Sequence, residues 1–183
     1  MKKIIILIFG VFCSSAIAQI PPPPISRSST TSNGLAINTR KSTLIEKRTT
    51  PLGKFKNLNI QKIVTKDVSD NSSESLLGIM YEYETFDEIS RKTLTIDKNE
   101  LGKLIQSLQT LEQKENEKTN IEAKYKFVTR NNIEFGSVYH ESLNNRANYI
   151  KMPSNNYSQN LIEYNREELK ELLRILKTAE LEL

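Results

Sequence analysis

The chain has 183 residues with 26 basic and 22 acidic side chains, a formal net charge of +4 at pH 7, one histidine and one cysteine. One cysteine cannot form an intramolecular disulfide, and a single histidine and cysteine cannot supply a zinc site of the usual ligand sets. The basic excess is confined to the first 54 residues, because residues 55–183 hold 18 basic and 21 acidic side chains, which disfavours nucleic acid as a partner.

The first residues form a typical export signal. Two lysines precede an apolar run over residues 4–12, and Ala16 and Ala18 supply the small side chains that signal peptidase reads. We therefore predict cleavage after Ala18 and a mature chain that begins at Gln19, in the periplasm or outside the cell. The apolar run is shorter than the roughly 20 residues that span a bilayer, so no transmembrane span is expected after cleavage.

Cys13 offers a second fate, because lipoproteins are lipidated on a cysteine at the end of the signal. Phe12 stands where a lipobox has a small residue, so the sequence favours cleavage after Ala18 over lipidation. If Cys13 is removed with the signal, the mature protein has no cysteine for disulfides, metal sites or nucleophilic catalysis.

Residues 19–54 have the composition of a spacer. Four prolines at residues 21–24 are followed by a stretch over residues 26–34 that is almost all Ser, Thr and Asn, with very few large apolar side chains. Such a segment buries too little surface to offset its ordering entropy, so we expect a disordered spacer that is stiff at the prolines. Recognition of the prolines by an aromatic groove is the alternative. A single globular domain is then expected over residues 55–183.

In the first unit of this domain, residues 55–118, apolar and polar residues alternate in three segments. The alternation predicts strands over residues 57–67, 77–84 and 91–96. At Asp97 the period changes to that of a helix, because Asp97 is a natural N-cap and Glu100 completes a capping-box pattern. An apolar stripe follows at Leu101, Leu104, Ile105, Leu108 and Leu111.

The second unit, residues 119–183, repeats this order of elements. Strands are predicted over residues 121–127, 133–139, 146–152 and 160–164, with a tight turn at Asn131 and Asn132. Asn165 is the next N-cap, and Glu168 lies three residues later. The second apolar stripe is formed by Leu169, Leu172, Leu173, Leu176 and Ala179.

The two helices match at a constant offset of 68 residues, which aligns both caps and both stripes. The upstream strands match better at an offset of 58, from Gly78 to Gly136, so the second unit would carry about ten extra residues around 143–158. Internal duplication predicts this pattern. The alternative is that caps and apolar stripes make any two such helices alike.

These elements predict an α+β domain. We expect an antiparallel sheet of about seven strands covered by two amphipathic helices, as a tandem repeat of strand meander and helix with a pseudo-two-fold relation. The order of elements over residues 55–183 resembles the tandem strand-meander-helix units of the Whirly and Pur-alpha-type single-strand nucleic-acid binders, without their specific motifs. With its lysine-led signal and Ala-x-Ala-Gln start, the chain also resembles the small, uncharacterised exported proteins of Bacteroidota, a resemblance that implies export and no activity.

Few residues are arranged for catalysis, and we predict no catalytic, cofactor or metal site. His140 is the only histidine, and no Gly-x-Ser-x-Gly motif accompanies it. Glu82 and Glu84 lie about 7 Å apart on one strand face, a spacing found in inverting glycosidases, but that face is the solvated one. The loop over residues 67–71 has oxygen ligands for calcium yet lacks the EF-hand glycine and closing glutamate, so a polar turn is preferred.

Aromatic side chains on the strands favour binding instead of catalysis. Those in phase with the core should be buried, so the candidates for exposure lie around residues 143–158 and on the adjoining sheet face. The predicted function is an exported, non-enzymatic binding or interaction protein whose partner is another envelope protein or a surface ligand. The alternatives are a carboxylate-based hydrolase of envelope glycan and a single-strand nucleic-acid binder. The predicted partner-contact residues are Tyr149, Tyr157, Arg146 and Lys151.

Overall fold

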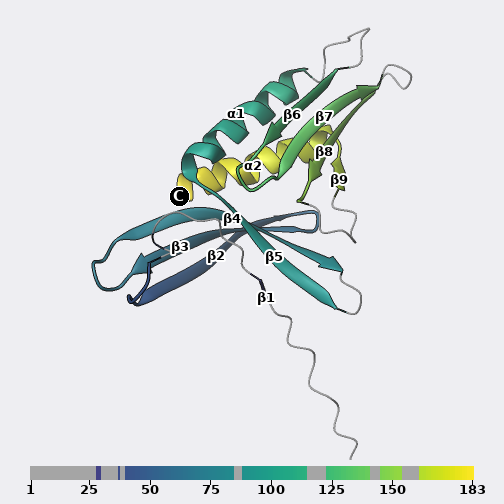
Figure 1. Cartoon of the computed structure of the whole chain (residues 1–183). Coiled ribbons are helices and arrows are strands. Elements are labelled where there is room, and N and C mark those ends of the chain that lie inside the picture. Colours follow the sequence, from purple (N-terminus) through teal and green to yellow (C-terminus); the bar gives the residue numbers. More distant parts are fainter. Residues whose placement is uncertain are drawn as a thin grey trace, which may run out of the picture.

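The computed structural model describes residues 28–29, 37, 40–84, 88–114, 123–140, 145–153 and 161–183. Within these residues the chain forms two helices and nine strands (Figure 1). In chain order they are β1 (Ser28–Ser29), β2 (Ile45–Phe55), β3 (Leu58–Asp67), β4 (Ser73–Glu84), β5 (Ile89–Ile96), α1 (Lys98–Lys114), β6 (Lys124–Val128), β7 (Glu134–His140), β8 (Asn145–Lys151), β9 (Leu161–Tyr164) and α2 (Arg166–Glu182). The predicted α+β class with two helices is confirmed.

The strands form two sheets. Strands β2 to β5 pair antiparallel in sequence order, with the short β1 parallel to β5 at the edge, and β6 to β9 form a separate antiparallel sheet. The prediction of one sheet of about seven strands is therefore wrong. Strand pairing within each meander is local, and α1 with the segment after it separates β5 from β6 in the sequence. Alternation along each strand does not reveal which strands share a sheet.

Strand β2 corrects the predicted end of the spacer. We expected residues 19–54 to lie outside the fold, but β2 pairs with β3 from Ile45 opposite Asp67 to Phe55 opposite Leu58. Residues 47–51 of β2 are exposed, so this edge strand is held by backbone hydrogen bonds more than by burial. Its composition therefore resembles that of a spacer. Of the predicted spacer before β2, the structure describes residues 28–29, 37 and 40–44. The other residues of that segment lie outside the described residues.

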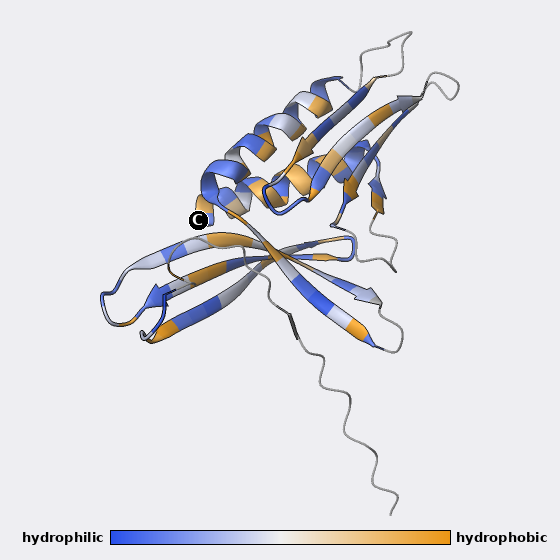
Figure 2. Cartoon of the chain, in the orientation of Figure 1, coloured by the Kyte–Doolittle hydropathy of each residue, from blue (hydrophilic) through white to orange (hydrophobic). Residues whose placement is uncertain are grey.

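Both helices pack against the sheets on their apolar sides (Figure 2). All ten residues of the two predicted stripes are buried, which confirms the helical periodicity. Helix α2 also buries Ile175, which faces Gly53 of β2; a Cβ atom at Gly53 would lie 3.1 Å from its Cγ2 atom. One core cluster includes residues of both sheets and both helices, so the two units share a core. The helices are thus covered by two sheets, where we had expected one.

The helix starts differ in one respect. At α2 the predicted capping box is complete: the Glu168 amide donates to Asn165 at 3.0 Å, and the Asn165 amide donates to Glu168 at 2.8 Å. At α1 the Glu100 amide donates to Asp97 at 2.8 Å, but the Glu100 carboxylate accepts from the backbone amide of Arg130 at 2.6 Å. The Arg130 side chain also pairs with Asp97. The β6–β7 turn is thereby tied to the start of α1, which positions the second sheet.

The predicted hairpin turn at Asn131 and Asn132 joins β6 to β7. Asn132 has a φ of 60°, in the left-handed region that asparagine tolerates, and its amide donates to the Thr129 carbonyl at 2.9 Å. The Asn131 side chain donates to the carbonyl of Thr95 at the end of β5. This side-chain bond is a second link between the two units.

The strand comparison between the two units needs correction. The offset of 58 aligned β4 with β7, but β4 is the third strand of its meander from β2, and β7 is the second strand of its own. Strand β8, within the segment that we had considered additional, is the third strand of the second sheet. Each unit therefore has four sequential antiparallel strands followed by a helix, and β8 in the segment 143–158 corresponds in order to β4 of the first unit.

Candidate functional site

Tyr149 lies across the face of the β6–β9 sheet that points away from the helices. Strand alternation places Ile150, which is fully buried, on the core side and Tyr149 on the outer side. Tyr149 is directly opposite Gly136 in the register, and a Cβ atom at Gly136 would lie only 2.4 Å from Cζ of the Tyr149 ring. The ring therefore needs glycine beneath it. A single glycine on β7 thus allows the Tyr149 ring of the neighbouring strand to lie flat across the sheet.

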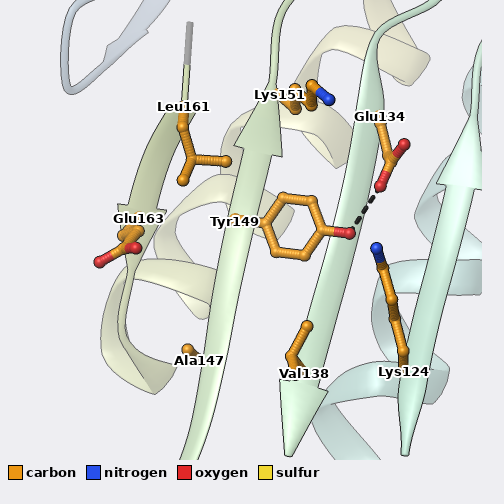
Figure 3. Close-up of a pocket in the computed structure, with 8 residues that line it drawn as sticks. All are labelled: Lys124, Glu134, Val138, Ala147, Tyr149, Lys151, Leu161 and Glu163. Carbon is orange, nitrogen blue, oxygen red and sulfur yellow. Dashed lines mark hydrogen bonds between the residues drawn. The ribbon is translucent and has the colours of Figure 1, made fainter. Parts of the chain in front are cut away.

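The Tyr149 hydroxyl donates a hydrogen bond of 2.6 Å to the Glu134 carboxylate (Figure 3). This bond, together with the charges of nearby lysines, lowers the pKa of Glu134 from its ordinary value. Burial, followed by the bond to Glu134, raises the pKa of Tyr149 to about 12. The carboxylate stays charged and the phenol stays protonated at neutral pH, so the pair is a fixed structural unit.

Lysine side chains surround this pair. The ammonium group of Lys124 lies 5.9 Å from the centre of the Tyr149 ring, and Figure 3 shows it pointing towards the tyrosine hydroxyl. Lys126 and Lys151, like Lys124, help to lower the pKa of Glu134. The side chains enclose a shallow depression of about 330 Å³, which we call the Tyr149 hollow. Its lining residues are Lys124, Glu134, Val138, Ala147, Tyr149, Lys151, Leu161 and Glu163.

The structure brings together only two of the four predicted contact residues. Tyr149 and Lys151 both line the Tyr149 hollow. Arg146 lies on the opposite face, where its guanidinium group is 5.4 Å from the Tyr125 ring centre and 5.7 Å from that of Tyr139. Tyr157 is outside the described residues. Tyr149 is only 9% exposed, so the expectation that its side chain stands free in solvent is wrong.

The sequence analysis singled out only Tyr149 and Lys151 of the eight lining residues, and it did not identify the role of Gly136 beneath the ring. Lys124, Glu134 and Gly136 each lie on a predicted strand, and alternation alone puts all three on the same side as Val128 and Val138. What was missing is the register that sets Gly136 beside Tyr149 and Lys124 beside Val138. The glycine in the middle of a predicted strand was the available signal, because such glycines often mark close approach by a neighbouring group.

The acidic loop after β3 is closed by an arginine. Arg40 pairs with Asp67 at 3.1 Å and with Asp70 at 2.5 Å, and its guanidinium group also donates to the Ser72 hydroxyl at 3.1 Å. Hydrogen bonds from Ser72, and then the Arg40 interaction, lower the pKa of Asp70 to about 2. The Arg40 guanidinium group provides these carboxylates with the positive charge that a calcium ion provides in a calcium-binding loop. The carboxylates therefore hold the N-terminal side of β2 to the β3–β4 turn.

Of the two carboxylates considered for hydrolysis, Glu82 pairs with Arg91 of the neighbouring strand at 2.8 Å. The Glu84 side chain and the side chain of His140 are outside the described part of the structure. Glu134, which carries the carboxylate of the Tyr149 hollow, lies on the other sheet. Among the described residues, no group of three or more His, Cys, Asp or Glu side chains is placed to hold a metal ion. Neither described helix has the length and apolar character needed to cross a membrane.

Comparisons with protein-family models, with curated proteins and with solved structures gave no significant match to this chain. The resemblances to Whirly and Pur-alpha-type proteins and to exported Bacteroidota proteins therefore stay predictions. The function has to be argued from the residues of the chain itself.

Proposed function

We propose that the mature protein is an exported, non-enzymatic binding protein that recognises an acidic segment of another envelope or surface protein. The observation that carries this proposal is the outer face of the β6–β9 sheet, where three lysines surround the fixed Tyr149–Glu134 pair. Val128 and Leu161 on the same face are 47% and 50% exposed. A rigid surface with apolar residues and a local positive charge suits an acidic, partly apolar partner.

The electrostatics of the site support binding over hydrolysis. A general acid needs a carboxyl group whose pKa is raised, whereas the pKa of Glu134 is lowered by its tyrosine partner and the lysines. The pKa of Tyr149 is raised to about 12, so the phenol stays protonated at neutral pH and cannot accept a proton as a general base. Glu82, the other described candidate, is held by Arg91.

We also propose that the two units arose by duplication of a four-strand meander and helix. Their common order of elements and the matching helix caps support this origin. The outer face of the first sheet buries Ile63 and Leu76, at 2% and 3% exposure, but leaves Ile89 58% exposed. Exposed apolar residues therefore occur on both outer faces, and the lysines around the fixed Tyr149–Glu134 pair are what favours the second unit for binding.

Site-specific cross-linking in the native cells tests the binding face. A photo-reactive phenylalanine analogue replaces Leu161, and in a control variant it replaces Leu181, which is 87% exposed on α2. The proposal expects a discrete cross-linked product from position 161, attached through an acidic segment of the partner, and none from position 181. Equal products from both positions, or an attachment site in a basic segment, would refute the proposal.

Export is tested separately by N-terminal sequencing and intact mass of the protein recovered from the periplasm or medium. The proposal expects the mature chain to begin at Gln19. Recovery of the uncleaved chain from the cytoplasm, or of a chain that begins with a lipid-modified Cys13, would contradict it.

A further inference from the structure

We propose that the free edge of β6 accepts an extended segment of the partner as an additional strand, with acidic and apolar residues alternating along that segment. This inference rests on the proposed function, because the segment belongs to the protein that the outer face recognises. It adds a location, a backbone geometry and a sequence pattern for the ligand.

The backbone of β6 offers hydrogen-bonding groups that point away from the sheet. Among the described residues, β6 is the edge strand of its sheet and pairs with β7 alone. The carbonyl of Ala123 accepts from Tyr139 at 3.0 Å, and the Thr129 amide donates to Ile133 at 2.9 Å. Because alternate residues of an antiparallel strand face the same neighbour, the peptide groups of Lys124, Lys126 and Val128 face the open edge. The described structure shows no backbone partner for these three residues.

A groove runs beside this edge. Its volume is about 220 Å³, and α1 and β6 form its walls through Ser107, Thr110, Leu111, Tyr125, Lys126 and Phe127. The side chains of Tyr125 and Phe127 are only half-buried, although they pack against the core. An added strand would direct every second side chain to their side of the sheet. Apolar side chains at those positions would cover Tyr125 and Phe127.

The remaining side chains of an added strand would lie on the outer face, beside Lys124 and Lys126. Both lysines are exposed, and opposite charges in neighbouring strands are favourable. Glutamate or aspartate is therefore the matching residue at these positions. A second copy of β6 would bring lysine next to lysine, and this repulsion is a known protection against edge-to-edge self-association. The charges thus select a different, acidic segment.

Other strand edges in the described structure lack this combination. Strand β2 carries Pro51, which has no amide hydrogen, and its pairing is irregular between Pro51 and Gly53. Strand β9 has only four residues, and β1 interrupts the edge of β5 by pairing with Arg91 and Lys92 in its middle. A short or irregular strand edge is a poor template for strand addition. Strand β6 has both unpaired peptide groups and an adjoining groove.

The test uses isotope-labelled mature protein, residues 19–183, and a short synthetic peptide in which glutamate alternates with valine. Two-dimensional NMR reports binding, and amide hydrogen exchange reports new hydrogen bonds. The expected result is slower exchange at the amides of Lys124, Lys126 and Val128 when the peptide is bound. A peptide with the same sequence but methylated backbone nitrogens, and one with lysine in place of glutamate, should bind about tenfold more weakly or not at all.

The variant K124E/K126E reverses the charge on the β6 edge without touching the core. It should bind the glutamate peptide about tenfold more weakly and prefer the lysine peptide. The matched control is K47E/K54E, which reverses two exposed lysines on the edge strand β2 and should bind as the unmodified protein does. Unchanged spectra away from β6 establish that both variants are folded.

Three results would overturn the inference. The first is binding of the glutamate peptide with spectral changes confined to the Tyr149 hollow and no slower amide exchange in β6. This result would leave the proposed function intact. Another is absence of peptide binding while position 161 still cross-links to an acidic partner. The third is protection of the β6 amides in a concentration-dependent dimer without peptide, which would identify a second copy as the occupant.

Discussion

Replacement of Gly136 by alanine tests whether the Tyr149 ring is fixed by the glycine beneath it. The new Cβ atom would lie 2.4 Å from Cζ, 2.5 Å from the hydroxyl oxygen and 2.7 Å from Cε1 of Tyr149. Real Cβ contacts of this length do not occur, so the ring has to move. Movement of the ring breaks its hydrogen bond to Glu134.

The expected cost follows from three contributions. Overpacking costs about 1–3 kcal/mol, and loss of one hydrogen bond at a half-buried carboxylate costs about 0.5–1.5 kcal/mol. The lower chain entropy of alanine in the unfolded state returns roughly 0.5–1 kcal/mol. We therefore expect G136A to reduce the free energy of unfolding by about 0.5–4 kcal/mol.

Equilibrium unfolding in urea, combined with a double-mutant cycle, measures this effect. In the Y149A background no ring lies above position 136, so only the chain-entropy contribution remains and G136A should stabilise by roughly 0.5–1 kcal/mol. G102A is the control for glycine replacement, since its Cβ atom meets only the Oε1 atom of Glu180, at 3.1 Å. In helix α1 this change should stabilise by about 0.5–1 kcal/mol.

The result that refutes the reasoning is additivity. If G136A costs the same in both backgrounds within about 0.5 kcal/mol, the ring and the glycine are not coupled. Stabilisation by G136A in the unmodified protein would have the same meaning.

Further measurements test the ionisable pairs and a helix cap. Glu134→Gln should lower the pKa of Tyr149 from about 12 while burial keeps it above the ordinary value, as followed by NMR of the tyrosine Cζ carbon; an unchanged pKa would disprove the coupling. Because burial and then the bond to Glu134 raise the pKa of Tyr149, the contribution of the protonated phenol to stability is complete below the ordinary tyrosine pKa of about 10 and is lost as the pH rises through about 12. Because the pKa of Asp70 is depressed to about 2, the Ser72 hydrogen bonds and the Arg40 interaction stabilise the fold above the ordinary aspartate pKa, and this contribution is lost as the pH falls through about 2. In acid titrations of stability, Asp70→Asn should flatten this low-pH loss, and an unaltered profile would contradict the assignment. Asn165→Ala should cost about 1 kcal/mol in urea unfolding, whereas Asn165→Asp should stay within about 0.5 kcal/mol; equal losses would show that the side-chain cap is not responsible.

The sequence by itself determined the elements whose side chains follow a regular period. The alternation of Leu77, Ile79 and Tyr81 and the stripe that contains Leu104 and Leu108 predicted β4 and α1, and the caps marked where both helices begin. These signals are local, because the direction of the side chains repeats every two residues in a strand and every 3.6 residues in a helix. Burial of one face is enough to make this period visible in the sequence. The α+β class follows from the same signals.

Only the tertiary structure decided how these elements are grouped and what the outer face contains. In the described part of the chain, two sheets enclose two helices because apolar residues such as Ile175 need cover on a second side of the helix. A helical stripe does not specify which sheet provides that cover. Strand β2 is held by pairing with β3, so its exposed side chains carry no periodic signal. The Tyr149 hollow depends on the register that puts Tyr149 over Gly136 and its hydroxyl beside Glu134. Register is a relation between strands, and hydrogen bonds across the sheet fix it.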